Sequence, residues 1–580
     1  MKKILLPTLL AFLLSCSDSE TPDFPPYEGI SSSSSEKPIR SSSSEKSISS
    51  SSSKEPDVPS AADSLPPSGH YASGLAFTLP SSVYCDKTGK LPTVSSAMQP
   101  GSAQTLTQTT ILRCEQLLNI SRPVTQVMRT YIIGRLPDLP IVSIAADPAE
   151  FSSKYNTRTG DYDIPIHVDF FERGASHAWS YPAELSPMGN ASREFPKKSV
   201  AVSFKEKYGQ KNIKYPLFPS HPNLTKFKHF ILRNNGNNYQ NDYIRDMLMT
   251  SLTEGLDIDY QKGRAAVVYY NGEYWGIHNL RERSNSDYYE TNYNYNEDYI
   301  DLVKYIDGGR EVSRGSDEDY QTNVIGWLES GVSLANEANM EILEERIDVD
   351  NFTNHFQSRI FYNDRDWPGN NIKMWRSTSP RTKWRFFMYD TDHGFGSWGT
   401  GACQNLTTLA FVTTESVGCA RVGWPNPAYS TLILRKLLEN QNYKNAFINR
   451  FSLLIATYFE SSRVNARIDA LMADINSETQ YDQSRWPNRP WSRPLSTIVN
   501  FANSRPNIMQ SEIQSHFGLK APVNITITGY THVDGLPIPS FAGSSVTFKA
   551  YPGVPMKLKW SGGERTIDVA TDGATFTAGQ

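Results

Sequence analysis

Short runs of apolar and β-branched residues, bounded by Gly, Pro, Asn and Asp, recur along the first half of the chain and again near its end. Runs of this length with turn residues between them are typical of strands. Asn271-Gly272 lies between two of the runs and supplies the left-handed residues of a type I′ turn, which predicts a hairpin. The strands that this pattern predicts are 75–79, 109–114, 129–133, 139–144, 164–171, 200–204, 265–270, 274–280, 523–527, 546–551 and 556–560.

A spacing of three to four residues between apolar positions replaces these runs in other segments. Phe447, Phe451 and Leu454 show the spacing that puts apolar side chains on one face of a helix. The helices predicted in this way are 243–256, 432–438, 443–458 and 464–475. The pattern therefore predicts an α+β core with antiparallel hairpins and a helical C-terminal half, flanked by small all-β modules at 68–137 and 521–580.

A second hairpin, predicted within 366–396, carries the most informative polar residues. Its predicted strands are 372–375 and 383–389, with a loop at 377–380. Asn371 comes directly before the first strand and Asp390 directly after the second, so we expect them side by side, on the order of 5 Å apart. Asp366 enters the same corner from the preceding loop. Asp and Asn are also common at turns, where they bond their own backbone, and that alternative stays open for each residue taken singly.

Carboxylate and amide oxygens are the ligands that a phosphate-bound Mg²⁺ prefers. Protein kinases use the same order of residues: a catalytic Asp, an Asn five positions later, a hairpin, and a metal-binding Asp followed closely by Gly. The segment 366–396 therefore predicts a metal-dependent phosphoryl-transfer site. The sequence 394–399 also satisfies G-x-G-x-x-G, but no helix and parallel strand follow it, so a dinucleotide-binding fold is not expected.

The N-terminal residues carry an export signal. Lys2 and Lys3 precede an apolar run, 4–14, that suits a secretory signal and is short for a membrane span. The run ends in Leu-Leu-Ser-Cys, which resembles the bacterial lipobox, so 1–16 is expected to be a lipoprotein signal and Cys16 the lipidated N-terminus. The serine-rich segment 17–67 has too little apolar surface to offset its ordering entropy and is expected to be a flexible tether. We therefore expect an exported, membrane-anchored lipoprotein, periplasmic or at the cell surface.

The composition of the chain restricts the classes of partner that we expect it to bind. A net charge of -4 gives no basic footprint, so nucleic acid is not an expected partner. The aromatic share of 12% is typical of carbohydrate-associated exported proteins as well as of ordinary cores, which leaves a polysaccharide partner open beside a protein one. Apart from Cys16, the chain has four cysteines, an even number in a chain predicted to be exported. We predict the disulfides Cys85–Cys114 and Cys403–Cys419, because each pair closes a short local loop.

Several segments, taken in their order along the chain, resemble the sequence pattern of one protein family. They are 189–199, 232–236, 244–246, 271–282, 366–375 and 384–396. Together they make the region 138–520 resemble the spore coat protein H (CotH) kinase family, a group of atypical, secreted or surface protein kinases. The segment 68–137 resembles, more loosely, the small β domain appended to chitobiase-type exported enzymes. The resemblance implies an atypical protein-kinase-like core that uses ATP with Mg²⁺ or Mn²⁺.

The resemblance also implies roles for single residues. Lys198 would contact the nucleotide phosphates, with Lys197 as the alternative, and the turn 189–193 with Arg193 would cover them. Glu282 would orient the lysine or support the metal, and Arg233 would pair with phosphate or with the acids. The residues implied for catalysis and metal binding are Asp366, which accepts or orients the substrate hydroxyl, Asn371 and Asp390, which hold the metal, and Asp392, a second carboxylate at the metal.

Three functions remain open at this point. The first is a kinase that transfers the γ-phosphoryl group of ATP to Ser or Thr of an extracytoplasmic or cell-surface protein. The second is a structural or adhesion protein that keeps the kinase-like scaffold without turnover. The third keeps the nucleotide site but transfers AMP. Ion pairs between surface residues are an alternative role for Lys197, Lys198, Arg193 and Glu282.

Overall fold

The computed structural model describes most of the chain from Ser64 onward: residues 64–93, 95, 98–116, 125–157, 160–238, 242–306, 309–397, 406–415, 425–487 and 495–580. The expected signal segment with Cys16, most of the serine-rich tether, and the expected pair Cys403–Cys419 lie outside these residues. Among the helices of these residues, none combines the length and the apolar character needed to span a membrane.

The first strands form two small sheets. Their bounds are β1 Gly69–Tyr71, β2 Leu75–Thr78, β3 Val83–Asp86, β4 Ala103–Leu106, β5 Thr110–Gln116 and β6 Thr125–Ile133. The strand order is β1-β6-β5-β3 in one sheet and β2-β4 in the other. A buried disulfide joins Cys85 on β3 to Cys114 on β5, where the two residues are directly opposite in the antiparallel register.

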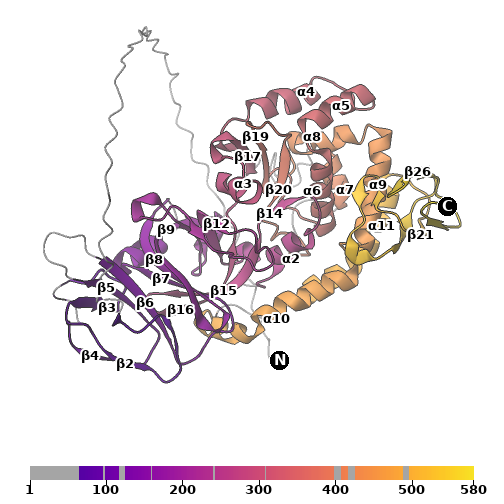
Figure 1. Ribbon diagram of the computed structural model, residues 1–580. Coiled ribbons are helices and arrows are strands. Elements are labelled where there is room, and N and C mark those ends of the chain that lie inside the picture. Colours follow the sequence, from indigo (N-terminus) through magenta and orange to yellow (C-terminus); the bar gives the residue numbers. More distant parts are fainter. Residues whose placement is uncertain are drawn as a thin grey trace, which may run out of the picture. The chain divides into compact units, whose positions relative to one another are not determined.

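Seven strands close into a barrel, seen in purple and magenta in Figure 1. The order around it is β10-β13-β16-β15-β7-β8-β9. The predicted hairpin at Asn271-Gly272 is confirmed: both residues have positive φ, 50° and 83°, and they join β15 to β16. The closure was not predicted from the sequence. The bounds are β7 Ile141–Ala146, β8 Ile164–Glu172, β9 Ser176–Met188, β10 Ser199–Ser203, β13 His229–Arg233, β15 Gly263–Tyr270 and β16 Glu273–Arg281.

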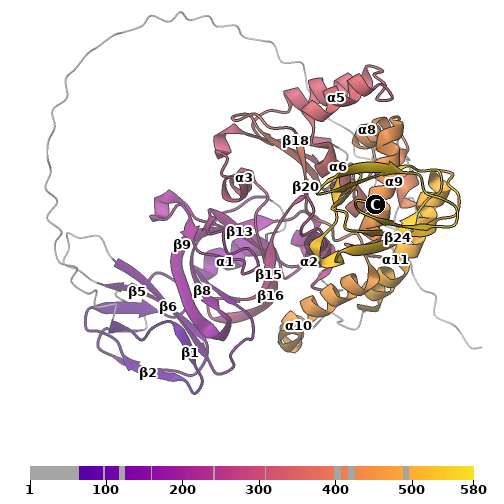
Figure 2. The same ribbon diagram turned by 45° about the vertical axis from the view of Figure 1, so that its right-hand side comes forward.

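A second, five-stranded sheet carries the hairpin of 366–396. Its order is β14-β20-β19-β17-β18, and helix α6 (Val349–Tyr362) packs on β20 (Figure 2). The second strand of the hairpin is shorter than predicted, because the backbone of Trp384 exchanges hydrogen bonds with Arg346 and Asp348 (both 2.9 Å) and not with β19. The bounds are β14 Asp259–Tyr260, β17 Ile300–Ile306, β18 Gly309–Arg314, β19 Ile372–Ser377 and β20 Arg385–Met388.

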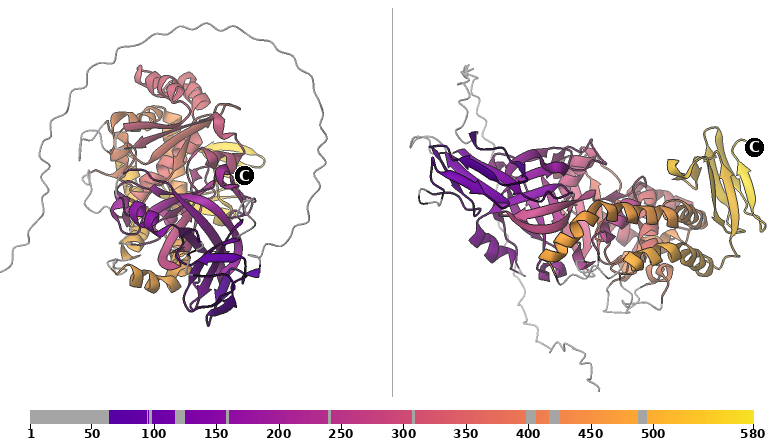
Figure 3. Two further views of the ribbon diagram at one scale, coloured as in Figure 1. Left: turned by 90° about the vertical axis from the view of Figure 1, so that its left-hand side faces the viewer. Right: turned by 90° about the horizontal axis from the view of Figure 1, so that it is seen from below.

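Helices dominate the later part of the chain, and the C-terminal strands pack on α9 (Figure 3). The helices are α2 Arg245–Leu252, α7 Thr408–Thr413, α8 Ala428–Leu437, α9 Gln441–Ala456, α10 Ser461–Arg485 and α11 Leu495–His516. Helices α7 and α11 were not predicted, and in α11 Pro506 interrupts the helical pattern. Helix α10 is longer than predicted and packs on β16 of the barrel. Seven further strands follow α11, from β21 (Val523–Thr528) to β27 (Ala574–Thr577). The described fold therefore mixes α and β structure, as predicted.

Candidate functional site

One large cavity, with a volume of about 1520 Å³, is lined by residues of the barrel and of the five-stranded sheet. The barrel contributes the turn between β9 and β10 and the ends of β13 and β16. The sheet contributes β17, β18 and the ends of the hairpin strands β19 and β20. This volume exceeds the roughly 300–1000 Å³ of a typical small-molecule pocket.

Four polar residues, here called the acid corner, gather on one wall of this cavity: Asp366, Asn371, Asp390 and Asp392. Ile372 on β19 pairs with Met388 on β20, so Asn371 and Asp390 leave the sheet at the same end. Both residues have positive φ, 51° and 52°, a conformation that Asn and Asp tolerate better than most residues. The Nδ2 of Asn371 donates to Asp366 Oδ2 at 2.9 Å. The structure therefore brings the predicted residues together.

Arginines neutralise part of the acid corner. The guanidinium of Arg233, at the end of β13, donates to Asp390 Oδ1 at 2.6 Å and to Asp392 Oδ2 at 3.0 Å. A fourth acid behind the corner, Asp246 on α2, pairs with Arg281 and accepts from the backbone N of Thr391 at 2.9 Å. Burial alone raises the pKa of Asp246, but Arg281 and Arg233 outweigh it and hold the pKa well below its usual range.

Two of the acids have raised pKa values. Burial, with the neighbouring charge of Asp390, raises the pKa of Asp392 to about 7, although Arg233 acts in the opposite direction. Burial also raises the pKa of Asp366, and this rise is partly offset by His393, whose Nε2 lies 3.7 Å from Asp366 Oδ2. A carboxylate whose pKa is raised toward neutrality is a better proton acceptor for a hydroxyl substrate. His393 also lines the cavity and thus lies within the site.

Three cations, here called the basic wall, line the same cavity: Arg283, Lys304 and Lys373. The Nζ of Lys373 donates to the carbonyl and the hydroxyl oxygen of Ser284, both at 2.6 Å. Burial, together with Lys304 and Arg283, lowers the pKa of Lys373 to about 7. Lys304 pairs with Glu311 at 2.9 Å. Arg283 makes no hydrogen bond or ion pair with any residue that the structure describes.

A comparison with protein families identifies the group. The family model described as CotH kinase protein matches residues 185–509, which include both walls of the cavity. The chain belongs to the CotH family. The resemblance found in the sequence is thereby confirmed. No curated protein matches the chain.

The two lysines expected at the nucleotide phosphates of this CotH chain do not line the cavity. Lys197 is fully buried, and its Nζ contacts Asp482 Oδ1 on α10 at 2.6 Å. Lys198 turns back into its own loop and donates to the carbonyl oxygens of Phe195, at 3.0 Å, and Arg193. The side chains of Lys197 and Lys198 therefore point in different directions, and neither side chain lines the cavity. Arg193 does line the cavity, and its guanidinium donates to the carbonyl of Gly160 at 3.0 Å.

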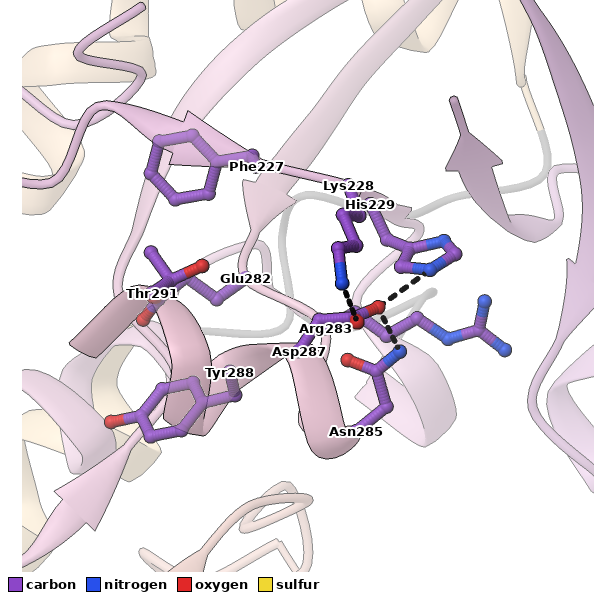
Figure 4. A pocket seen from close by; sticks show the side chains of 9 residues that line it. All are labelled: Phe227, Lys228, His229, Glu282, Arg283, Asn285, Asp287, Tyr288 and Thr291. Atoms are coloured by element: carbon purple, nitrogen blue, oxygen red, sulfur yellow. Dashed lines mark hydrogen bonds and ion pairs between the residues drawn. The ribbon is translucent and has the colours of Figure 1, made fainter. Parts of the chain in front are cut away.

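Glu282 is also placed away from the cavity. Its carboxylate accepts from the backbone N of Lys262 (3.0 Å) and from Asn292 Nδ2 (2.8 Å). Glu282 lines a second pocket, of about 10 Å³, which has room for about one water molecule (Figure 4). Its neighbours Arg281 and Arg283 line the large cavity, and Arg283 lines the small pocket as well.

The donor set of the acid corner fits a divalent cation such as Mg²⁺ or Mn²⁺. The Nδ2 of Asn371 donates to Asp366, so its Oδ1 is the atom that could bind a metal ion. Asp390 and Asp392 supply hard carboxylate oxygens on the same wall. Another acidic group, Asp287 with Glu290 and Glu297, fits a metal less well. The Nζ of Lys228 lies within 3.1 Å of a carboxylate oxygen of each of these three acids.

Proposed function

We propose that this CotH-family chain is an atypical, Mg²⁺-dependent protein kinase that transfers the γ-phosphoryl group of ATP to Ser or Thr. One observation carries the proposal: the acid corner and the basic wall line the same cavity. Phosphoryl transfer needs positioned reactants and neutralised charge more than covalent help from the protein. A wall of carboxylates for the metal and a wall of cations for the phosphates meet both needs.

The cations would hold the triphosphate. Arg283, which has no partner among the described residues, and Lys373 are the groups with the greatest gain from a bound phosphate, because burial lowers the pKa of both. At the barrel end of the cavity, Tyr162, Pro187 and Met188 provide an apolar surface for the base. The turn with Gly189 (φ 88°) lies beside this surface.

The acid corner would serve the metal and the acceptor. Asn371, Asp390 and Asp392 would hold the divalent cation, which when bound neutralises charge on the transferred phosphoryl group. Asp366, held by the amides of Asn370 and Asn371 at 2.9 Å each, would accept the proton of the acceptor hydroxyl. Arg233 would keep Asp390 and Asp392 in place.

The test combines binding and transfer. Isothermal calorimetry with Mg²⁺ and a non-hydrolysable ATP analogue should show binding, and intact-mass analysis after incubation with ATP and protein acceptors should show the mass of one phosphate. Addition of AMP would support a nucleotidyl transferase. No binding and no transfer, with Asp390→Ala indistinguishable from the parent, would leave an inactive scaffold as the better description. The contact of Arg233 with two of the acids is the observation that favours an inactive scaffold.

The proposal also includes the cellular location of the reaction. The lipobox-like sequence ending at Cys16 supports a lipid-anchored protein outside the cytoplasm, with a cell-surface protein as acceptor and a polysaccharide as the alternative partner. Metabolic labelling with a radioactive fatty acid tests the anchor. Label on the parent and none on Cys16→Ala is the expected result, and equal labelling would exclude lipidation at Cys16.

A further inference from the structure

The large cavity is lined partly by residues of the barrel and partly by residues of the five-stranded sheet. At the barrel end lie Tyr162, Pro187 and Met188, and at the sheet end lie residues of β17 and β18, including Glu311 and Ser313. Since about 1520 Å³ exceeds what a single small ligand needs, a nucleotide at the barrel end leaves room for a second substrate at the sheet end.

Strand β18 forms the outer edge of the five-stranded sheet (Figure 2). All six of its residues are exposed, and its one partner strand in the described part of the chain is β17. The outer side of β18 therefore presents backbone N–H and C=O groups that no described strand pairs. Val312 places an apolar side chain, 42% exposed, in the middle of this edge. Such an edge is suited to bind an extended peptide as one more strand.

The register of the sheet relates this edge to the acid corner. Gly309 pairs with Ile306 at the end of β17, and Tyr305 pairs with Ile372, the residue after Asn371. The start of β18 thus lies at the same end of the sheet as the acid corner. A strand added to β18 would lie three strand spacings, about 14 Å, from β19. An extended chain covers that distance in roughly four residues.

We propose that the phosphoryl acceptor is an extended polypeptide segment that pairs with the outer edge of β18 and presents a Ser or Thr, roughly four residues away, to Asp366. This inference rests on the proposed kinase function. The acceptor hydroxyl oxygen forms the bond to the γ-phosphorus while the bond from that phosphorus to the β,γ-bridging oxygen breaks. The hydroxyl proton passes to Asp366, and ADP leaves.

The experiment uses the full chain and a library of short Ser-containing peptides in which one backbone amide at a time is N-methylated. Hydrogen bonds from one strand to its neighbour use alternate residues in an antiparallel pair. We therefore expect methylation at alternate positions, beginning roughly four residues from the Ser, to raise the peptide KM at least tenfold, with little effect at the positions between. Free serine derivatives should be poor acceptors.

A protein variant tests the same edge. Ser313→Trp fills the sheet end of the cavity, on the strand that pairs with Lys304 of the basic wall, so the peptide KM should rise at least tenfold and by a larger factor than the dissociation constant of the Mg²⁺-bound ATP analogue. The matched control is Ser504→Trp, at an exposed position on α11 outside the cavity lining, which should change neither value.

The outcomes separate the two proposals. Phosphorylation of peptides that is indifferent to N-methylation and to Ser313→Trp would overturn docking on β18 and leave the kinase function standing. Transfer to polysaccharide in preference to peptide would also overturn it. Failure of the parent chain to bind the nucleotide analogue and to phosphorylate any peptide would overturn both.

Discussion

The acid corner and the basic wall line one cavity, but they are built in different ways. The acid corner comes from one short segment around a hairpin, and its side chains are already held by hydrogen bonds, such as that from Asn371 to Asp366. The basic wall comes from three separate places: Arg283 after β16, Lys304 on β17 and Lys373 on β19. Arg283 has no described partner at all.

This difference fits the different roles proposed for the two walls. A metal needs oxygen ligands at fixed positions, and a hairpin end supplies them rigidly. Phosphates tolerate longer cationic side chains that close on them when the ligand arrives. Changes in the acid corner should therefore act mainly on turnover and metal binding, while changes in the basic wall should act mainly on nucleotide affinity.

The largest effect is expected at the acid corner. Asp390→Asn removes a carboxylate from the proposed metal site, so kcat/KM should fall on the order of 10³-fold and Mg²⁺ binding should be lost. Steady-state phosphorylation and calorimetry with Mg²⁺ measure the two effects. Asp469→Asn, an exposed change on α10, is the matched control. Normal turnover by Asp390→Asn would remove the acid corner from the mechanism.

The next largest effect is expected in the stability of the folded chain and not in the binding of ATP. Lys197→Met leaves Asp482 buried without its cation, which should cost about 3–5 kcal/mol of unfolding free energy. Urea denaturation measures this cost, and the double variant Lys197→Met/Asp482→Leu should recover most of it. The KM for ATP should be unchanged, since Lys197 does not line the cavity. A stable variant with a raised KM would return Lys197 to the nucleotide site.

The same two walls show what a sequence can predict. The acid corner was predictable because Asp366, Asn371 and Asp390 belong to one hairpin, whose strands and turn follow from local residue patterns. The type I′ turn at Asn271-Gly272 was predictable for the same reason. Local residue patterns are sufficient to predict a hairpin or a turn of this kind.

The basic wall and the lysine positions were not predictable in that way. The direction of Lys197 is decided by Asp482, 285 residues later in the chain, and nothing local to Lys197 indicates that contact. Gly276 leaves the space that Asp482 needs, because a Cβ there would clash with its carboxylate. Closure of the barrel through β9, β10 and β13 likewise depends on pairing between distant strands.

A smaller effect is expected in the basic wall. Arg283→Gln removes a charged hydrogen-bond donor from the proposed phosphate site, so the KM for ATP should rise roughly 10–100-fold while kcat changes little. Steady-state kinetics with varied ATP measure both values. Arg381→Gln, at a side chain that is 69% exposed and outside the cavity, should leave them unchanged. A fall in kcat with unchanged KM would contradict the separate roles of the two walls.

The smallest effect concerns pH. Burial and Asp390 raise the pKa of Asp392 to about 7, from roughly 3.9 in an unfolded chain. The metal-free folded state therefore holds a proton that the unfolded state has lost, and its stability should fall as the pH rises toward 7. The expected decrease in Tm is on the order of 2–4 °C.

Binding of Mg²⁺ should depend on pH in the opposite direction, because the metal requires the deprotonated carboxylate. Below a pH of about 7, the affinity should fall about tenfold for each pH unit. Calorimetry across this range, with Asp392→Asn for comparison, measures the dependence. A parent protein with the same flat profile as Asp392→Asn would show that Asp390 and Asn371 hold the metal without Asp392, which would then act only as a partner of Arg233.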